Sequence, residues 1–353
     1  IVYNNSVDKR IIKELGKYTN VVLIHPGDSE YIAEKLIHLG LSHIEADYLI
    51  ETPFCSKYNM ISYGTMRNYV MLTALFLEAD HLIYFDSDVY PKILNSFTNE
   101  NEYLFHETDF VGNHMKILLS SDDIVVTTGD YTGYYVVPKL NFPKLYDLLF
   151  GMQKEDQYER IVSGEEPVIQ RNIIPGRSET HKIIGGNCAV DLSNFNFLPP
   201  FHSNMLVMDN ECFLGRGEDT LFGPVIQKFN GRCIDIDMKI FHNCFGDFPN
   251  KPSIVVQKNI DRFYYACMGW IIRNPFYNFI TKRYTDNYEE IDIERRYKCL
   301  ELGSIAAAEY FSEERFLNFP KAFGDAYDKI ENDTNYFYNK LEVWDKMKSL
   351  LRK

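Results

Sequence analysis

The sequence predicts an α/β fold, in which a mixed β-sheet is flanked by helices and followed by a C-terminal helical extension. Two observations predict it. Over the first ~90 residues, short apolar runs alternate with amphipathic segments, as they do in βαβ units. Beyond about residue 250, strand signals stop and helical periodicity takes over. We therefore expect an α/β domain over residues 1–248 and a helical extension over residues 249–353.

The predicted elements of the first part follow from local signals. Ser29 is expected to cap a helix that ends at Gly40, because glycine commonly terminates helices. Fully apolar runs are expected to be buried strands, and turn residues mark where they end. The expected strands are Ile1–Tyr3, Val21–Ile24, His81–Phe85, Val125–Val126, Tyr134–Val137, Ile183–Val190 and Ile234–Phe241. The expected helices are Val7–Leu15, Ser29–Leu39 and Gly64–Ala79, with a largely helical segment from Tyr288 to Lys353.

The composition excludes some classes of protein. Hydrophobic residues make up 45% of the chain and aromatic residues 15%, which is enough to form a sizeable core, so disorder is not expected. The formal net charge is −13, so the basic footprint of a nucleic-acid binder is missing. A bound divalent cation can nevertheless make an acidic protein attractive to an anionic substrate.

The sequence also favours a cytoplasmic location. No apolar run reaches the roughly 18 residues of a membrane helix, and no signal peptide is visible. The seven cysteines include no closely spaced CxxC pair, which favours free thiols in a reducing compartment. The first residue is Ile1 rather than Met, so we expect that residues of the first strand precede it.

The sharpest local signal is Asp86-Ser87-Asp88, which directly follows the apolar run His81–Phe85. This position is the carboxyl end of a strand, where open α/β sheets bind ligands. Two carboxylates one residue apart can both reach a divalent cation if the chain turns between them. Oxygen ligands suit Mg²⁺ or Mn²⁺, and either ion can hold a diphosphate. The alternative is a pair of solvated acids that ends a strand.

Two further motifs follow in the chain. Glu218 and Asp219 lie between glycines and an apolar segment, so they are expected at a helix N-terminus, where the helix dipole favours acidic side chains. A simple acidic cap would explain them as well. His242 ends the predicted strand Ile234–Phe241 and is either a core histidine or a metal ligand.

In this order the three motifs resemble GT-A glycosyltransferases, which have a strand ending in Asp-x-Asp, a Gly-x-Gly-Glu-Asp segment and a strand ending in His. The stretch Gly215–Thr220 is similar to the catalytic segment of inverting enzymes such as galactosyl- and N-acetylhexosaminyl-transferases. The pair Arg67-Asn68 is similar to the one that many family-2-like members carry before the Asp-x-Asp strand. The resemblance covers roughly residues 1–248. It implies a GT-A, Rossmann-like fold and metal-dependent, inverting hexosyl transfer in glycan or polysaccharide biosynthesis.

The resemblance also implies roles for individual residues. Asp86 and Asp88 would hold Mn²⁺ or Mg²⁺ on the diphosphate of the donor, and His242 would complete the metal site. Asp219 would be the general base that deprotonates the acceptor hydroxyl, and Glu218 would bind a sugar. The other donor-binding residues would be Tyr3, Asn4, Asp28, Gly64, Arg67, Ser87, Gly185, Gly186 and Asn187.

The same resemblance implies the partners. A UDP-sugar is favoured as donor and a GDP-sugar is the alternative; the acceptor would be a glycan, a lipid-linked molecule or a protein. The second predicted strand ends in His25-Pro26-Gly27-Asp28 rather than in an acid before Gly-Ser, which departs from the family-2 pattern and leaves the nucleotide base open.

The segment 262–284 is rich in aromatic and basic residues and has two interpretations. It has the composition of a segment that lies on a membrane surface or binds a lipid acceptor. It also fits a helix that packs its aromatic side chains on the α/β domain. We favour packing, because Pro275 interrupts the helical pattern and the charge is not strongly basic.

Three other functions compete. A HAD-like phosphatase also places Asp-x-Asp after an apolar strand, but here Val89-Tyr90-Pro91 follows, and no downstream lysine and acidic pair fit that family. A sugar-nucleotide pyrophosphorylase would need a glycine-rich loop near its start, which is not visible. A non-catalytic carbohydrate-binding protein could retain the fold, although intact Asp86, Asp88, Asp219 and His242 argue against that.

Overall fold

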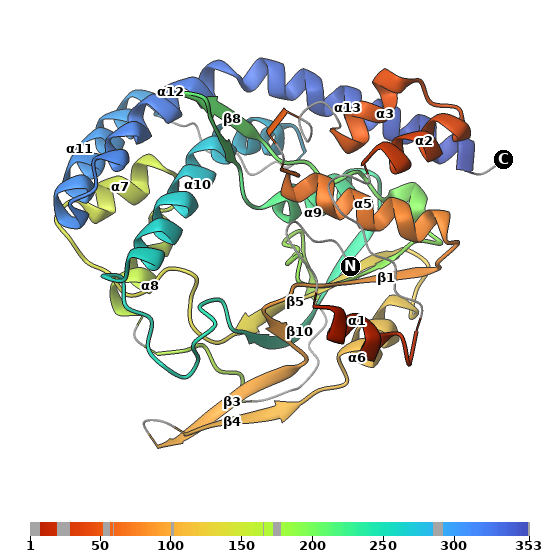
Figure 1. Cartoon of the computed structure of the whole chain (residues 1–353), viewed down its shortest axis with the longest axis horizontal. Coiled ribbons are helices and arrows are strands. Elements are labelled where there is room, and N and C mark those ends of the chain that lie inside the picture. The colour runs from red at the N-terminus through yellow and green to blue at the C-terminus, as the bar shows by residue number, and fades with distance from the viewer. Residues whose placement is uncertain are drawn as a thin grey trace.

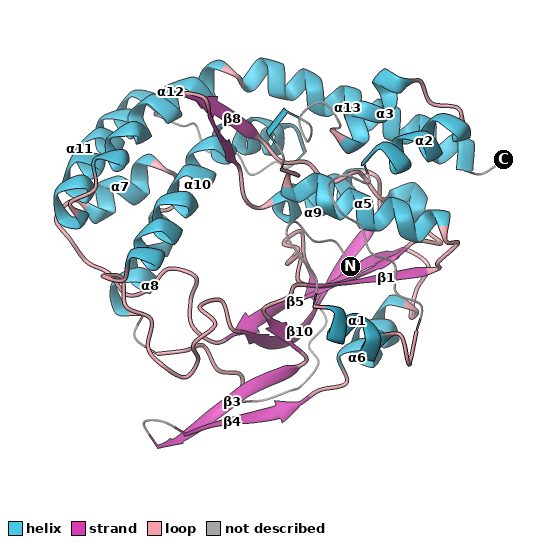
Figure 2. Cartoon of the chain, viewed as in Figure 1, coloured by secondary structure: helices cyan, strands magenta, loops and turns pink. Residues whose placement is uncertain are grey.

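The structure is a computed structural model that describes residues 8–19, 29–51, 57–58, 60–99, 102–164, 166–171, 178–284 and 292–351. As predicted, it is mixed α/β: helices flank a mixed sheet, and the C-terminal part is helical (Figure 1, Figure 2). The predicted strands Ile1–Tyr3 and Val21–Ile24 lie outside the described residues, as do the predicted site residues Tyr3, Asn4 and Asp28.

Among the described residues, helices come first along the chain, strands and helices are interspersed over residues 81–242, and helices follow over residues 257–351. The strands are β1 (His81–Phe85), β2 (Val89–Tyr90), β3 (Lys92–Asn99), β4 (Glu102–Glu107), β5 (Ile124–Thr132), β6 (Ser178–Glu179), β7 (Asn187–Asp191), β8 (Met205–Met208), β9 (Glu211–Leu214) and β10 (Arg232–His242). The α-helices are α1 (Lys9–Leu15), α2 (Ser29–Leu39), α3 (His43–Ile50), α5 (Tyr63–Phe76), α6 (Phe110–Leu118), α7 (Leu145–Gly151), α8 (Tyr158–Ser163), α9 (Glu218–Lys228), α10 (Gln257–Tyr284), α11 (Ile293–Phe311), α12 (Phe319–Asp328) and α13 (Ile330–Leu351).

The main sheet has the strand order β1-β7-β5-β10-β2, with β6 paired to β10. Strands β5 and β10 are parallel, whereas β7 is antiparallel to both β1 and β5, and β2 is antiparallel to β10. Two hairpins, β3–β4 and β8–β9, lie outside this sheet. The short β2–β10 pairing matters most for the site, because it brings the segment after β1 beside the end of β10.

The helix boundaries have identifiable physical causes, including those of α3, a helix that was not predicted from the sequence. Ser42 caps α3 through a capping box with Glu45, and the hydroxyl of Ser62 accepts the backbone N–H of Thr65 at the start of α5. Helix α2 ends before Gly40, whose φ of 115° lies in the left-handed region that favours glycine. These local signals explain why the predicted helices were found close to their actual bounds.

Three strand predictions need correction. The segment predicted as a strand at Tyr134–Val137 forms bends and loop instead, and the one predicted at Ile183–Val190 begins only at Asn187, after a turn. Strand β1 was predicted to be buried, but of its five residues only Tyr84 is, and Phe85 is 46% exposed. Apolar composition identified β1 correctly, but burial depends on what the rest of the fold places over it.

One hydrophobic core lies between the sheet and the helices near both ends of the chain. It combines Leu36 and Leu49 from the N-terminal helices with Leu72 of α5 and with Trp344 and Met347 of α13. Figure 1 shows α13 running past α2 and α3. The C-terminal helix is therefore part of the same core as the N-terminal helices.

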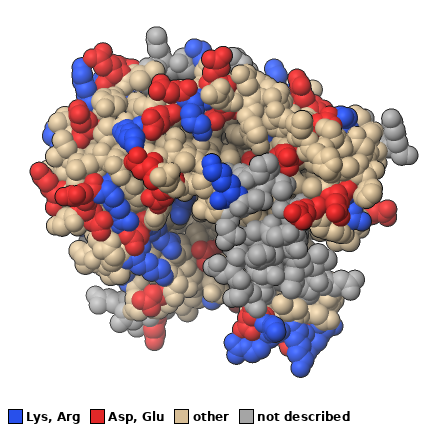
Figure 3. Space-filling model, turned by 45° about the horizontal axis from the view of Figure 1, so that its top comes forward, with Lys and Arg blue, Asp and Glu red and all other residues tan. Residues whose placement is uncertain are grey.

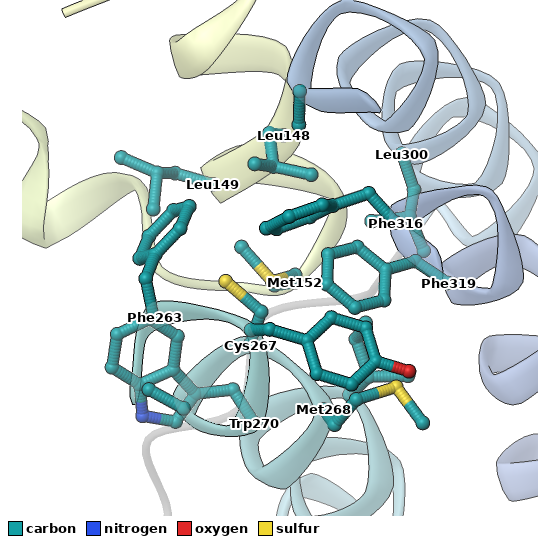
Figure 4. Packing of buried hydrophobic residues seen from close by; sticks show 14 of the residues in the cluster. Leu148, Leu149, Met152, Phe263, Cys267, Met268, Trp270, Leu300, Phe316 and Phe319 are labelled. Carbon is teal, nitrogen blue, oxygen red and sulfur yellow. The ribbon is translucent and has the colours of Figure 1, made fainter. Parts of the chain in front are cut away.

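A second core joins α7 to the C-terminal helices. Its members include Leu148 and Met152 at α7, Phe263 and Cys267 on α10, and Phe316 before α12 (Figure 4). Both cores thus contain residues from each side of position 248. The division into residues 1–248 and 249–353 remains a prediction, and the hydrophobic packing crosses it.

A buried ion pair also crosses that position. Lys340 of α13 donates to the Glu51 carboxylate at 2.9 Å, and both side chains are almost fully inaccessible to solvent. Ser62 and Thr65 donate to the other carboxylate oxygen of Glu51 at 2.8 and 2.6 Å. These hydrogen bonds give the buried carboxylate partners for both oxygens, which a charge in the protein interior needs.

Helix α10 contains most of the aromatic and basic segment, and its Pro275 lies inside the helix. Phe263, Trp270 and Phe276 are at most 9% exposed, so these three aromatic side chains pack within the protein, whereas Tyr265 is 43% exposed. No helix among the described residues is long and apolar enough to cross a membrane.

Candidate functional site

The Asp86-Ser87-Asp88 segment forms a tight turn between β1 and β2. The N–H of Val89 donates to the carbonyl of Asp86 at 3.1 Å, which closes the turn directly after the strand. The side chain of Ser87 is exposed at its tip, while Asp86 and Asp88 are half-buried. The chain therefore does turn between the two carboxylates, as a shared ligand site would require.

Asp88 lies beside His242 because β2 pairs with the end of β10. In this pairing Val89 is opposite His242, and Asn243 N–H donates to the carbonyl of Asp88 at 2.8 Å. Nε2 of His242 lies 3.1 Å from Oδ2 of Asp88. The hydrogen bond from His242 lowers the pKa of Asp88. The structure thus brings together two of the three predicted metal ligands, which are 154 residues apart in the chain.

Arg67 on α5 connects the Asp-x-Asp turn to the second acidic motif. Its Nε donates to Oε1 of Glu218 at 2.6 Å, and its Nη2 lies 3.5 Å from Oδ1 of Asp86. Burial would lower the pKa of Arg67, but the nearby carboxylates outweigh it and raise that pKa. Tyr84 holds the backbone of Arg67 in place, since its hydroxyl donates to the backbone carbonyl of Arg67 at 2.9 Å. Arg67 is therefore a fixed cation between two acidic motifs.

Asp219 lies in the first turn of α9, where the sequence predicted it. The backbone N–H of Gly185 donates to its Oδ2 at 2.8 Å, and the carbonyl of Gly185 accepts Nη1 of Arg67 at 2.8 Å. Burial and the adjacent Glu218 carboxylate together raise the pKa of Asp219 to about 6, against the opposing effect of Arg67. A carboxyl with a pKa this close to neutrality is suited to accept a proton in a reaction.

The turn formed by Gly185 and Gly186 allows these groups to approach closely. A Cβ on Gly185 would overlap the guanidinium of Arg67, and one on Gly186 would overlap the carboxylate of Asp86 and the hydroxyl of Tyr131. Burial raises the pKa of Asp86, and Arg67 only partly offsets that effect. A side chain at either glycine would therefore displace Arg67 or Asp86 from the positions that they occupy here.

Two other predicted donor-binding residues serve the architecture instead. Gly64 is buried, its N–H donates to the hydroxyl of Ser203 at 2.8 Å, and an added Cβ would meet the backbone of His202. Asn187 is fully buried, and its amide nitrogen donates to the carbonyls of Asp130 and Met238. Its amide oxygen lies 3.0 Å from Nε2 of His114. These contacts use the polar side-chain atoms of Asn187 within the sheet, so that side chain holds neighbouring strands together.

One site residue was not predicted from the sequence. Arg273 of α10 reaches the first turn of α9, where its Nη1 donates to the Arg216 carbonyl at 3.2 Å and lies 3.5 Å from the hydroxyl of Thr220. A Cβ on Gly217, whose φ is 90°, would overlap this guanidinium. The only signal in the sequence is a cation in the aromatic segment 262–284, for which packing is the favoured interpretation.

Asp88 and His242 place a carboxylate and an imidazole 3.1 Å apart, and both groups are able to bind a metal ion. Asp86 is turned toward Arg67. In the described part of the chain, no three His, Cys, Asp or Glu side chains are grouped so that they could hold a metal ion. The protein would therefore contribute a partial ligand set.

Comparison of the chain with protein-family models, with curated proteins and with solved structures found no match in any of the three. A function for this chain therefore has to be inferred from the geometry of the site.

Proposed function

We propose that this chain is a metal-dependent, inverting glycosyltransferase with a GT-A-type fold. One observation carries the proposal. Arg67 contacts Asp86 of the Asp-x-Asp turn, Glu218 of the second acidic motif and the carbonyl of Gly185, whose N–H binds Asp219. Segments that are far apart in the sequence thus converge on one buried cation, with a carboxyl of raised pKa beside it.

The residues divide into two groups by chemistry. Asp88 and His242 would hold Mn²⁺, with Asp86 beside them, and the ion would supply positive charge that stabilises the leaving diphosphate. Asp219 would accept the proton of the acceptor hydroxyl, because its pKa of about 6 leaves it mostly ionised at neutral pH. Attack from the side opposite the leaving group would invert the anomeric carbon. The ion pair of Arg67 and Glu218 would fix the metal-binding carboxylates and Asp219 in separate positions.

The substrates follow from the same assignment. A UDP-sugar is the favoured donor and a GDP-sugar the alternative, and the acceptor would be a glycan, a lipid-linked molecule or a protein. We expect the reaction to belong to glycan or polysaccharide synthesis in the cytoplasm. Gly186 and Ser87 lie next to the carboxylates of Asp86 and Asp88 and would contact the donor. Glycine has no side chain and serine a small one, so neither residue would block the donor.

The test is hydrolysis of nucleotide sugars with and without Mn²⁺. We expect slow release of sugar from one donor that depends on Mn²⁺ and is lost in Asp88→Asn. The matched control is Asp122→Asn, which removes an exposed carboxylate near β5 and should change nothing. Mn²⁺-independent turnover, or equal loss in both variants, would contradict the metal assignment.

Two other outcomes would point to the rival functions. Release of phosphate from a simple phosphomonoester, without activity on nucleotide sugars, would indicate a HAD-like phosphatase. Saturable binding of glycans without turnover of any donor would indicate a carbohydrate-binding protein. NMR of the product should show an inverted anomer, and a retained one would reject Asp219 as the base of a single displacement.

A further inference from the structure

Beside Asp219, on the side of α10, lies a group of three basic residues that the proposed transfer does not use. They are Lys154, Arg216 and Arg273, which we call the cationic group. Figure 1 shows α10, which carries Arg273, between α7 and α9. Lys154 follows the end of α7, and Arg216 precedes the first turn of α9. Three segments therefore each contribute one cation to the same region.

The guanidinium of Arg273 is fixed in position by uncharged oxygen atoms. Its Nε and Nη2 donate to Oδ1 of Asn274 at 3.0 and 2.9 Å, and its Nη1 donates to the Arg216 carbonyl. The amide of Asn274 in turn donates to the carbonyl of Met152, which fixes the turn before Lys154. A guanidinium has five N–H donors, so these contacts leave donor capacity and the whole positive charge available.

Lys154 and Arg216 lie along the same face of α10. The ammonium of Lys154 is 5.7 Å from the ring centre of Trp270, three residues before Arg273. The side-chain stem of Arg216 lies against Gly269, one helical turn before Arg273, because a Cβ on that glycine would meet it at 3.3 Å. The core shown in Figure 4 holds α7 and α10 together here, so the positions of Lys154 and Arg273 are fixed by packing.

No member of the cationic group forms an ion pair with a described carboxylate. Acidic and basic side chains are interspersed over the surface shown in Figure 3, and many basic residues form ion pairs, such as Arg232 with Asp123 and Glu179. Among the described residues, no carboxylate lies within 4 Å of a charged nitrogen of Lys154, Arg216 or Arg273.

The acids nearest to the cationic group in the chain have other partners. Glu155, next to Lys154, pairs with Arg296 at 2.9 Å. Burial lowers the pKa of Arg273, although nearby acids, including Asp219 and Glu218, oppose this effect. Burial and the charge of Arg273 lower the pKa of Lys154, against the opposing effect of Asp156 and Glu155. Because burial outweighs these acids at both residues and none of them forms an ion pair with either, a bound anion would stabilise both cations.

We infer that the acceptor carries an anionic group, a phosphate or a carboxylate, which binds to Arg273 and Lys154 while its hydroxyl faces Asp219. This inference rests on the proposed function. Asp219 would contact the acceptor, and Arg273 is held against Thr220, the next residue in α9. The donor diphosphate is assigned to other residues of the site, Asp88 and His242, and among the described residues neither of these forms an ion pair with the cationic group. The cationic group therefore selects the acceptor rather than the donor.

The first test uses inorganic phosphate and the metal-free protein, in a calorimetric titration. We expect saturable binding that weakens at least about tenfold in Arg273→Gln, because a charge-assisted hydrogen bond is lost. Lys154→Gln should also weaken phosphate binding, and Arg273→Lys should bind phosphate more tightly than Arg273→Gln does. The control is Lys258→Gln, which removes an exposed cation about 22 Å away on the same helix and should leave binding unchanged. Absence of binding, or equal effects in Arg273→Gln and Lys258→Gln, would overturn the inference.

The second test measures sugar transfer to three matched acceptors: a neutral hexoside, its phosphate derivative and its uronic acid. We expect kcat/KM to be at least about tenfold higher for one anionic acceptor, and Arg273→Gln to remove that preference. A preference for the phosphate derivative would identify the anionic group as a phosphate, and a preference for the uronic acid would identify it as a carboxylate. Transfer that favours the neutral acceptor and does not respond to Arg273→Gln would refute the anionic acceptor but leave the transferase standing. Arg273-dependent phosphate binding without transfer from any donor would refute the proposed function instead, and the acceptor role with it.

Discussion

Replacing Arg67 by glutamine should destabilise the protein strongly, because it leaves Glu218 buried without its cation. The side chain of Glu218 is 8% exposed and that of Arg67 14%, and their hydrogen bond is 2.6 Å long. Removing one partner of a buried ion pair costs about 3–5 kcal/mol in free energy of unfolding. The double variant Arg67→Gln/Glu218→Gln removes both charges, so we expect it to lose less, about 1–2 kcal/mol.

The measurement is urea unfolding followed by circular dichroism and by tryptophan fluorescence, whose transitions should coincide. The matched control is Arg232→Gln, which also removes an arginine that pairs with two carboxylates, but on the surface. Arg232 is 40% exposed and its partners more, so we expect a loss below about 1 kcal/mol. Equal losses in Arg67→Gln and Arg232→Gln, or a double variant less stable than Arg67→Gln, would refute the argument that Arg67 compensates buried charge.

Three further predictions concern the site. Asp88→Asn should weaken Mn²⁺-dependent binding of the donor nucleotide at least about tenfold in calorimetry, and unchanged affinity would remove Asp88 from the metal site. The pKa of Asp219 is raised to about 6, and a general base works only when it is ionised. We therefore expect kcat/KM to rise roughly tenfold from pH 5 to pH 7, and Asp219→Asn to abolish this rise. Gly186→Ala would push its Cβ into the Asp86 carboxylate and should lower the rate of donor hydrolysis at least about tenfold. Gly324→Ala is the control, because there is open space around that residue, and it should not change the rate. Similar rates in both variants would show that the turn tolerates a side chain.

Much of the local structure could be predicted, because it depends on neighbouring residues. Apolar runs identified β1 and β10, and the glycines and acids of residues 215–219 predicted the start of α9. Ser29 and Gly40 marked the two ends of α2. The prediction failed at Tyr134–Val137, an apolar run that forms bends and loop and pairs with no strand among the described residues.

The arrangement of the site depends on contacts that no local pattern encodes. The direction of β7 relative to β1 and β5 decides that Gly186, just before β7, meets Asp86, just after β1, and strand direction cannot be read from apolar composition. The contact between Arg273 and the start of α9 spans 57 residues. The buried pair of Lys340 and Glu51 spans 289 residues, and no local pattern in the sequence identifies it.

The position of α13 has a consequence for how the chain folds as it is synthesised. Trp344 packs beside Leu36 and Leu49 and donates its indole N–H to the carbonyl of Leu198 at 2.7 Å, so the N-terminal helices cannot complete their core until this residue has left the ribosome. Until then, their apolar faces would be open to chaperones and to wrong partners. Slowing translation through the last helix should therefore prolong the aggregation-prone period, even though the residues that become exposed belong to the first fifth of the chain.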